Sequence, residues 1–449
     1  MKKFALNSVP AVALAVQALG LLAHGSAVAA TSDEKLPFYI SGSETLLRDS
    51  NFSRTDRPQA ETVSSTAALL GLSKAFGRQQ YDLNTQFAVN RYAHYKELLN
   101  NDSKQVNGSV SSQFLANWQL SLGGSYSQNL NPIKDNVNVE RVVKNIRTYN
   151  SRNVALRYGL DALWSLTLTG DANTVRYSQA SYGGFEANQR STSMRVNYYP
   201  TDTLVWGLAY RPVSTHYVNS SPDRTVNDHN IDLSTNWLVT GLSKLDATFT
   251  RRRTSYSDDD MAATRSWSGS LGWRYTPGGM FSYNLNASRY TGTDRFNTEF
   301  AGYAANEANA RRDTLNLSTN FSASMQAAFT AKTSLRLSYA LSKNRYNYTS
   351  VANFSGQAEQ AQILGIPLSD FLCTFQGYCN TQTESRSIQH TTGLTLTFVP
   401  TRSVSTQCDL QVYSQTRDRY GIRYQGRSLG CSVTATLDSL SPLFDGWFD

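Results

Sequence analysis

The chain has 449 residues, a formal net charge of +8 and a mean hydropathy of −0.42. Beyond its first 30 residues, no run approaches the roughly 18 to 20 consecutive apolar residues of a membrane helix, which excludes a helical membrane protein. Leu, Ile and Val are sparse and Ser, Thr, Asn, Gln and Tyr are abundant, so the sequence also lacks the long apolar segments that fill a large soluble core. The mild positive charge suits a protein among outer-membrane lipid and lipopolysaccharide, and no pattern indicates a nucleic acid as partner.

Residues 1–30 have the pattern of a secretory signal peptide. Lys2 and Lys3 precede a mostly apolar run, Val9 to Ala23, that is too short to span a bilayer, and small residues follow it. Export across the inner membrane of a Gram-negative bacterium is therefore expected, with residues 31–449 forming one domain. A retained N-terminal anchor helix is the alternative.

From residue 36 onward, stretches of about ten residues alternate apolar and polar side chains, and the breaks between them are alternately short and long. Alternation with period 2 gives a strand one lipid face and one water face. Short periplasmic turns and long extracellular loops are typical of outer-membrane barrels. Short turns are predicted at Phe76-Gly77-Arg78, Asn117-Trp118, Gly159-Leu160-Asp161, Pro200-Thr201-Asp202, Thr240-Gly241-Leu242-Ser243, Thr276-Pro277-Gly278-Gly279, Thr330-Ala331-Lys332 and Pro400-Thr401-Arg402.

These turns give about eight hairpins, and one strand remains at each end, near residues 36–47 and 427–437. The predicted fold class is all-β: a transmembrane antiparallel β-barrel of about 18 strands in the cell outer membrane. On one strand, for example, Trp164, Leu166 and Leu168 are predicted to face lipid.

Aromatic residues gather where the predicted strands end, at Tyr198, Tyr199, Trp206, Tyr210, Trp237, Trp273, Tyr275 and Phe281. Trp and Tyr favour the headgroup level of a membrane, because one end of the ring is apolar and the other forms hydrogen bonds. The aromatic-rich strands of a soluble β-protein are the alternative interpretation.

Segments of the N-terminal third follow a recognisable order. These are Asp49-Ser50-Asn51-Phe52-Ser53-Arg54, Phe76-Gly77-Arg78-Gln79-Gln80-Tyr81-Asp82-Leu83, Arg91-Tyr92 and Ala116-Asn117-Trp118-Gln119-Leu120-Ser121-Leu122-Gly123-Gly124. Over about a hundred residues, this order resembles the EpsL-like outer-membrane proteins of exopolysaccharide gene clusters, which often occur with the exosortase sorting system. The resemblance implies passage of a secreted polysaccharide through the outer membrane, raises periplasmic export components as partners and brings no catalytic motif.

The alternation also predicts which charged side chains line the lumen. Six arginines take inward positions, namely Arg157, Arg195, Arg211, Arg252, Arg274 and Arg336. Guanidinium groups bind carboxylates and sugar hydroxyls, which suits a channel for an acidic polysaccharide. Five aspartates share the inward parity, namely Asp82, Asp171, Asp232, Asp246 and Asp409. Internal salt bridges are therefore the alternative role for the arginines.

Inward aromatic residues are further candidates for contact with a sugar chain. Tyr92 and Tyr290 have inward parity and are predicted to lie near the outer mouth, where they are placed to stack on sugar rings. The alternative is that both belong to the aromatic belt.

Arg251-Arg252-Arg253 ends one predicted strand and precedes Asp258-Asp259-Asp260. A phosphate clamp for lipopolysaccharide, a divalent-cation loop and a solvated loop with internal ion pairs are the three interpretations. Three consecutive aspartates lack the spaced ligands of a calcium loop, so no metal or cofactor is predicted. After residue 30 the histidines are His94, His216, His229 and His390. Neither a catalytic pattern nor a nucleophile motif is recognised, so no enzyme is predicted, and a dispersed esterase or lipid A-modifying site is the alternative.

Four cysteines in an exported chain predict disulfides. Cys408 and Cys431 share parity with lipid-facing residues, and a hairpin centred between Arg419 and Tyr420 places them opposite each other. Unpaired thiols are the alternative.

The longest loop is predicted from near Tyr346 to near Ile388. Within it, residues 357–364 are expected to form a short helix, and Cys373 and Cys379 to close a small disulfide ring. The apolar content of the loop predicts that it folds inward and narrows the mouth, and a loop that stands outward is the alternative.

The sequence and the resemblance together predict a passive outer-membrane channel for exopolysaccharide export, with the direction set by synthesis and inner-membrane export. Inward hydroxyl and amide groups exchange hydrogen bonds with a sliding sugar chain at little net cost. A general or sugar-selective diffusion porin is the alternative, because its strands have the same pattern. A structural or adhesion barrel is disfavoured, because no appended domain is recognised.

Overall fold

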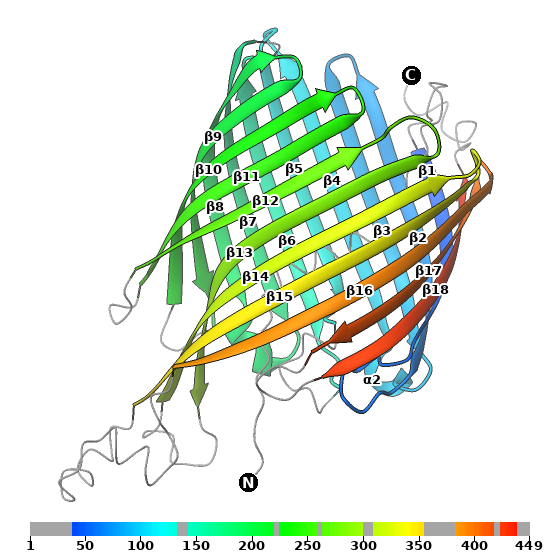
Figure 1. The fold of residues 1–449 in the computed structure, drawn as a ribbon, viewed down its shortest axis with the longest axis vertical. Coiled ribbons are helices and arrows are strands. Elements are labelled where there is room, and N and C mark those ends of the chain that lie inside the picture. The colour runs from blue at the N-terminus through cyan, green and yellow to red at the C-terminus, as the bar shows by residue number, and fades with distance from the viewer. Residues whose placement is uncertain are drawn as a thin grey trace, which may run out of the picture.

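The computed structural model describes residues 38–132, 142–160, 162–219, 224–257, 263–299, 309–353, 382–416 and 423–437. Over these residues the chain forms one antiparallel sheet that closes into an 18-stranded barrel (Figure 1). The predicted fold class is therefore confirmed, including the number of strands.

The first nine strands are β1 (Phe38–Asp49), β2 (Glu61–Phe76), β3 (Gln79–Tyr92), β4 (Asn101–Phe114), β5 (Trp118–Leu130), β6 (Ile146–Tyr158), β7 (Trp164–Tyr177), β8 (Ala187–Thr201) and β9 (Leu204–Tyr217). The others are β10 (Arg224–Thr240), β11 (Ser243–Tyr256), β12 (Thr264–Tyr275), β13 (Phe281–Glu299), β14 (Asn309–Ala328), β15 (Thr333–Asn353), β16 (Gln382–Thr401), β17 (Val404–Gln415) and β18 (Tyr424–Leu437). A short helix, α2 (Lys96–Leu99), and a 3-10 helix, η2 (Ala180–Phe185), lie between strands. Neither helix in the described part of the chain is long and apolar enough to cross a membrane.

The sheet closes where the first strand meets the last. Each strand pairs with its neighbours along the chain, and β1 also pairs with β18. This seam runs from Ile40 opposite Leu437 to Asp49 opposite Ser428. Closure leaves no free strand edge in the hydrocarbon, which is the condition for a membrane-spanning sheet.

The short turns lie close to their predicted positions. At the turn between β2 and β3, Gly77 has φ +58°, a left-handed conformation that favours glycine. The turn predicted at Asn117-Trp118 instead covers Leu115 to Asn117, and Trp118 begins β5. The strands are longer than about ten residues: β1 has 12 and β15 has 21.

Alternate side chains divide between two faces of the sheet. On the outer face, large apolar side chains are exposed, as at Leu46 and, as predicted, at Trp164. The lumen face carries polar side chains, such as Ser41, whose hydroxyl lies 2.9 Å from that of Thr436, and the buried Ser165. An apolar exterior around a polar interior fits lipid outside and water inside.

Aromatic side chains on the outer face lie next to the short turns. Trp118 packs on Tyr158 with ring centroids 4.9 Å apart, and Trp164 packs on Tyr198 at 4.4 Å. Tyr199, which the sequence grouped with this belt, instead faces the lumen, where its hydroxyl is a hydrogen-bond partner of lumen side chains. The outward aromatics form a girdle at the periplasmic interface of the membrane.

The long connections lie at the opposite end of the barrel (Figure 1). The two strands on either side of the longest connection extend further than predicted. β15 continues to Asn353, and β16 begins at Gln382. The expected ends near Tyr346 and Ile388 were wrong, since strand pairing continues to Thr349 opposite Gln382.

Several predictions fall outside the described residues. They concern the signal peptide at 1–30, the aspartates at 258–260, the loop helix at 357–364 and the ring of Cys373 and Cys379. The inward fold of the 347–387 loop over the mouth therefore stays a prediction.

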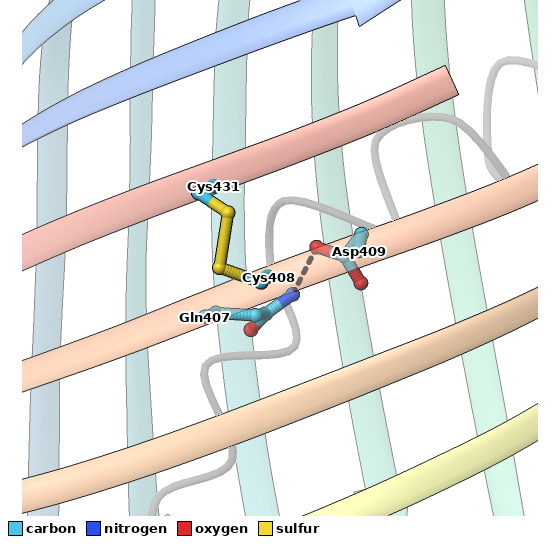
Figure 2. The surroundings of a disulfide bond; sticks show 4 residues. All are labelled: Gln407, Cys408, Asp409 and Cys431. Atoms are coloured by element: carbon cyan, nitrogen blue, oxygen red, sulfur yellow. Dashed lines mark hydrogen bonds between the residues drawn. A yellow bond between two sulfur atoms is a disulfide. The ribbon is translucent and has the colours of Figure 1, made fainter.

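A disulfide joins the last two strands on the outer face (Figure 2). Cys408 of β17 lies directly opposite Cys431 of β18, in the predicted register, with their Cα atoms 4.1 Å apart. Their neighbours Gln407 and Asp409 have the opposite parity, and Gln407 Nε2 donates a hydrogen bond to Asp409 at 2.8 Å (Figure 2).

A buried polar cluster, here called the seam cluster, lies beside the seam at its long-loop end. Arg54 forms an ion pair with Asp49 at 2.9 Å, and its guanidinium lies 3.5 Å from the ring centroid of Tyr413. The Tyr413 hydroxyl donates to Asp49, and Asn51 Nδ2 donates to the backbone carbonyl of Gln425 at 3.0 Å. Burial lowers the pKa of the Arg54 guanidinium, an effect that the charge of Asp49 opposes. The cluster thus ties the first loop to β17 and β18.

We expect Arg54→Ala to reduce the free energy of unfolding by about 3 kcal/mol, because it leaves the buried Asp49 carboxylate without its ion-pair partner. Urea unfolding in lipid vesicles, followed by tryptophan fluorescence, measures the change. Arg57→Ala, at an exposed position of the same loop, is the matched control and should change stability by less than about 0.5 kcal/mol. Equal destabilisation by both variants would show that the cluster does not hold the seam.

Mass spectrometry of unreduced protein should recover the peptides of Cys408 and Cys431 as one cross-linked species. The bond spans a sequence separation of 23, so replacing both cysteines by serine should lower stability by about 3 kcal/mol. The variant should still fold, because backbone pairing of β17 with β18 runs from Val404 to Gln415. Free thiols at both positions in oxidised protein would contradict this expectation.

Candidate functional site

The lumen wall is the candidate site, because it carries all six arginines that the alternation placed inward. Arg157 and Arg195 both lie opposite Thr167, which alternates along β7 with the outward Leu166 and Leu168. The same alternation places the other four on the lumen face, namely Arg211 of β9, Arg252 of β11, Arg274 of β12 and Arg336 of β15.

Arg157 is held by a polar network across β6, β7 and β8. Its Nη2 donates to the Tyr199 hydroxyl at 3.0 Å, and that hydroxyl lies 3.2 Å from Ser165 Oγ. Asn197 Nδ2 also donates to Ser165 Oγ at 3.2 Å. Arg157 Nε is buried and has no hydrogen-bond partner among the described residues. The network therefore fixes the guanidinium without using all of its donors.

Arg195 crosses a neighbouring strand to reach its partner. Its Nη1 donates to Ser234 Oγ of β10 at 2.9 Å, although β9 lies between the two strands. The residue of β9 at the crossing is Gly207, where a Cβ atom would lie 2.6 Å from Ser234 Oγ and 2.8 Å from Asn197 Oδ1. Glycine at this position therefore leaves the space that the arginine contact occupies.

Asp232 of β10 organises the next part of the wall. Arg211 Nε donates to Asp232 Oδ2 at 3.0 Å, and the Thr250 hydroxyl donates to Asp232 Oδ1 at 2.7 Å. The carboxylate thus has partners on β9 and β11, one on either side. Asp232 is only 5% exposed, so these contacts compensate for its burial on the wall.

Arg252 continues the wall toward β13. Its Nε donates to Asn230 Oδ1 at 3.1 Å, and its Nη1 donates to the backbone carbonyl of Thr291 at 2.9 Å. Asn230 is 1% exposed and its own Nδ2 donates to the Arg211 carbonyl at 3.0 Å. Arg252 therefore lies along the wall across β12, and its two anchors are both uncharged.

Ion pairs neutralise little of this surface. Among the six arginines, Arg211 alone forms an ion pair with a carboxylate of the described residues. Among the five inward aspartates, Asp246 forms an ion pair with Lys244 at 3.3 Å, besides the pair of Asp232 with Arg211. The other three accept from hydroxyls: Asp82 from Ser73 at 2.7 Å, Asp171 from Ser191 at 2.9 Å, and Asp409 from Thr395 at 2.6 Å. The described part of the lumen wall therefore has two ion pairs among these residues, and its other inward aspartates form hydrogen bonds with neutral groups.

The two candidate tyrosines differ in their surroundings. Tyr92 is on the lumen face, but its ring packs on Phe52 of the β1–β2 loop, with centroids 5.8 Å apart. Tyr290 lies opposite Ser318 on the lumen face and is 45% exposed. Tyr290 is thus the better placed of the two to contact material in the lumen.

The arginine triplet is divided between the two faces. Arg252 faces the lumen, whereas Arg251 lies opposite the exposed Ile231 on the outer face and Arg253 lies opposite His229. No group of three or more His, Cys, Asp or Glu residues that could hold a metal ion occurs in the described ranges.

The contacts between wall residues were not identified from the sequence. Ser165 and Thr250 share the inward parity that the alternation gives, but nothing local names their partners. Arg157 and Tyr199 are 42 positions apart in sequence, and Arg195 and Ser234 are 39 apart. Such pairs follow from the stagger of neighbouring strands, which the sequence pattern alone leaves open.

No family model and no curated protein matches the chain. Among solved structures it is similar to the FrpB iron transporter of Neisseria meningitidis (F5-1 variant, apoprotein), with 10% identity, coverage of 89% of this chain and 81% of that one, and a TM-score of 0.44. It is also similar to OccK11 (OpdR) of Pseudomonas aeruginosa, with 11% identity, coverage of 90% and 98%, and a TM-score of 0.42.

A closed barrel with an apolar outer face, an aromatic girdle and a polar lumen defines the class of protein. It is a transmembrane β-barrel protein of the outer membrane, with a porin-like architecture.

Replacing Arg195 and Arg252 together by Gln should reduce the anion-to-cation permeability ratio by roughly twofold, because two lumen charges are lost. Their anchors are neutral, so glutamine leaves no carboxylate unpaired. The reversal potential in planar bilayers under a KCl gradient measures the ratio. The matched control pairs Arg190→Gln with Arg253→Gln, outer-face positions on the same two strands, β8 and β11. An equal shift in the control would contradict a lumen origin.

Proposed function

We propose that this barrel is a passive outer-membrane channel for a secreted exopolysaccharide. The observation that supports it best is the lumen wall from β6 to β13, where arginines lie along the wall and are anchored mainly to uncharged groups. A polysaccharide presents hydroxyl groups, and in acidic polymers carboxylates, along its whole length. Repeated donors along a wall suit such a chain better than one closed binding site.

The hydrogen-bond capacity of the arginines favours sliding. A guanidinium has five N–H donors. Arg195 gives one to Ser234, and Arg252 gives one to Asn230 and one to Thr291. The others remain for water or for sugar oxygens. Because a hydrogen bond exchanged with water is worth only about 1 kcal/mol net, successive sugars pass from donor to donor without a deep trap.

The exposed ring of Tyr290, in the middle of β13, adds an apolar surface on which a sugar ring can stack. The resemblance of the N-terminal third to EpsL-like proteins agrees with the same function. Synthesis and inner-membrane export of the polymer supply the direction of transport, and the barrel supplies a hydrated path through the outer membrane.

Deletion of the gene should abolish surface polysaccharide and leave the polymer in the periplasm. Wild-type protein should restore secretion, whereas the variant with Arg195→Gln and Arg252→Gln should restore it only in part, because fewer donors line the path. Immunodetection of polymer in periplasmic and extracellular fractions measures the distribution. Normal secretion by the deletion strain would reject export of the polymer and favour a general or sugar-selective diffusion porin.

A further inference from the structure

The outer face carries a second set of arginines that the lumen does not use. On several strands, the first outward position beyond the apolar side chains, toward the long loops, is an exposed arginine. Arg48 follows Leu46 on β1, and Arg152 precedes Val154 on β6 in the same way. Arg427 has this position on β18. Positive charge therefore borders the apolar band at its extracellular side.

The charge is densest on three adjacent strands. The outer arginine patch, as it is called below, consists of Arg251 and Arg253 of β11, Arg265 of β12 and Arg289 of β13. Arg253 lies directly opposite Arg265 in the register of the sheet. Arg251 lies opposite Trp267, and the guanidinium of Arg289 is 3.9 Å from the Trp267 ring centroid. All four arginines thus lie on the outer face within two register positions of Trp267, and Arg289 contacts its ring.

This patch has no internal neutralisation in the described part of the chain. None of its four guanidinium groups forms an ion pair with a described carboxylate. Like charges directly opposite each other across two strands, as Arg253 and Arg265 are, destabilise a sheet. Arg289 Nε is buried and lacks a hydrogen-bond partner among the described residues. Together these features indicate a site for an external anion.

The surroundings of the patch define what kind of anion fits. Phe249 stacks on Trp267 with centroids 6.3 Å apart and has the next outward position on β11 toward the membrane centre. Leu271 follows on β12, beyond Gly269, and both Phe249 and Leu271 are half exposed. The ligand must therefore carry negative charge beside hydrocarbon chains. Trp267 lies between the apolar side chains and the arginines, which fits the preference of indole rings for the headgroup level of a membrane. Material in the lumen does not meet this face, because its side chains point away from the lumen.

We propose that the outer arginine patch binds the phosphate groups of lipopolysaccharide in the outer leaflet. The planar guanidinium presents paired N–H donors that match phosphate oxygens, and directly opposed residues are about 5 Å apart at their Cα atoms, so Arg253 and Arg265 can share one phosphate. The acyl chains of the same molecule lie against Phe249 and Leu271. Binding removes the repulsion between the arginines and fixes the barrel to its lipid neighbours at β11–β13.

The test uses the full mature protein folded in detergent and purified lipopolysaccharide, with affinity measured by thermophoresis. Replacing Arg253, Arg265 and Arg289 together by Gln should weaken binding at least about tenfold, because charge-assisted bonds to phosphate are lost. The lumen variant with Arg195→Gln and Arg252→Gln is the matched control and should bind as wild type does. Heat-dependent gel mobility checks that each variant is folded.

A second measurement needs no variant. Wild-type protein should bind chemically dephosphorylated lipopolysaccharide at least about tenfold more weakly than the intact form, because the acyl chains alone do not engage the arginines. Equal affinity for the two forms would overturn the proposal. So would a folded outer-patch variant that keeps wild-type affinity. Neither result would bear on polysaccharide export, which depends on the lumen face.

Discussion

The pairing of β1 with β18 is the interaction on which the rest of the structure depends. Without it, both strands would leave a row of backbone N–H and C=O groups in hydrocarbon, and each unsatisfied group costs several kcal/mol there. Two additional links lie beside this pairing. Asp49 and Arg54 join the first loop to Tyr413, and the disulfide at Cys408 joins β17 to β18. Backbone and side-chain bonds thus hold the seam itself, and a covalent bond fixes β18 to the next strand, β17.

Closure of the barrel also places each side chain either toward lipid on the outer face or toward water in the lumen. Residues of the same type then have different roles on the two faces. In the triplet at 251–253, Arg252 lies along the lumen wall between Asn230 and Thr291, while Arg251 and Arg253 belong to the outer face. One wall arginine is anchored by partners on neighbouring strands, and its outer neighbours lie where lipid headgroups begin. A single tripeptide therefore supplies one side chain to the lumen face and two to the outer face.

Much of this arrangement follows from local pattern. Turn residues gave the number of strands, and parity gave the face of every candidate arginine, because the face depends only on counting by two. Parity together with the predicted hairpin centre gave the register of Cys408 with Cys431. Contacts between distant strands do not follow in this way. The Asp49 to Arg54 segment was recognised only as a motif, since its partner Tyr413 becomes a neighbour only after closure. Strand ends were underestimated where β15 and β16 continue past the apolar band.

That continuation has a consequence for the shape of the rim. Beyond Arg345, β15 runs on to Asn353, whereas β8 has only Ala187 to Gln189 beyond Arg190. At about 3.4 Å per residue and the usual strand tilt, the wall on the β13–β16 side rises roughly 20 Å above the charged border of the membrane. The described strands therefore end at different heights around the exit, and the wall is highest on the β13–β16 side. If the barrel exports a polysaccharide as proposed, the taller strands β13 to β16 shield the emerging chain on that side of the exit.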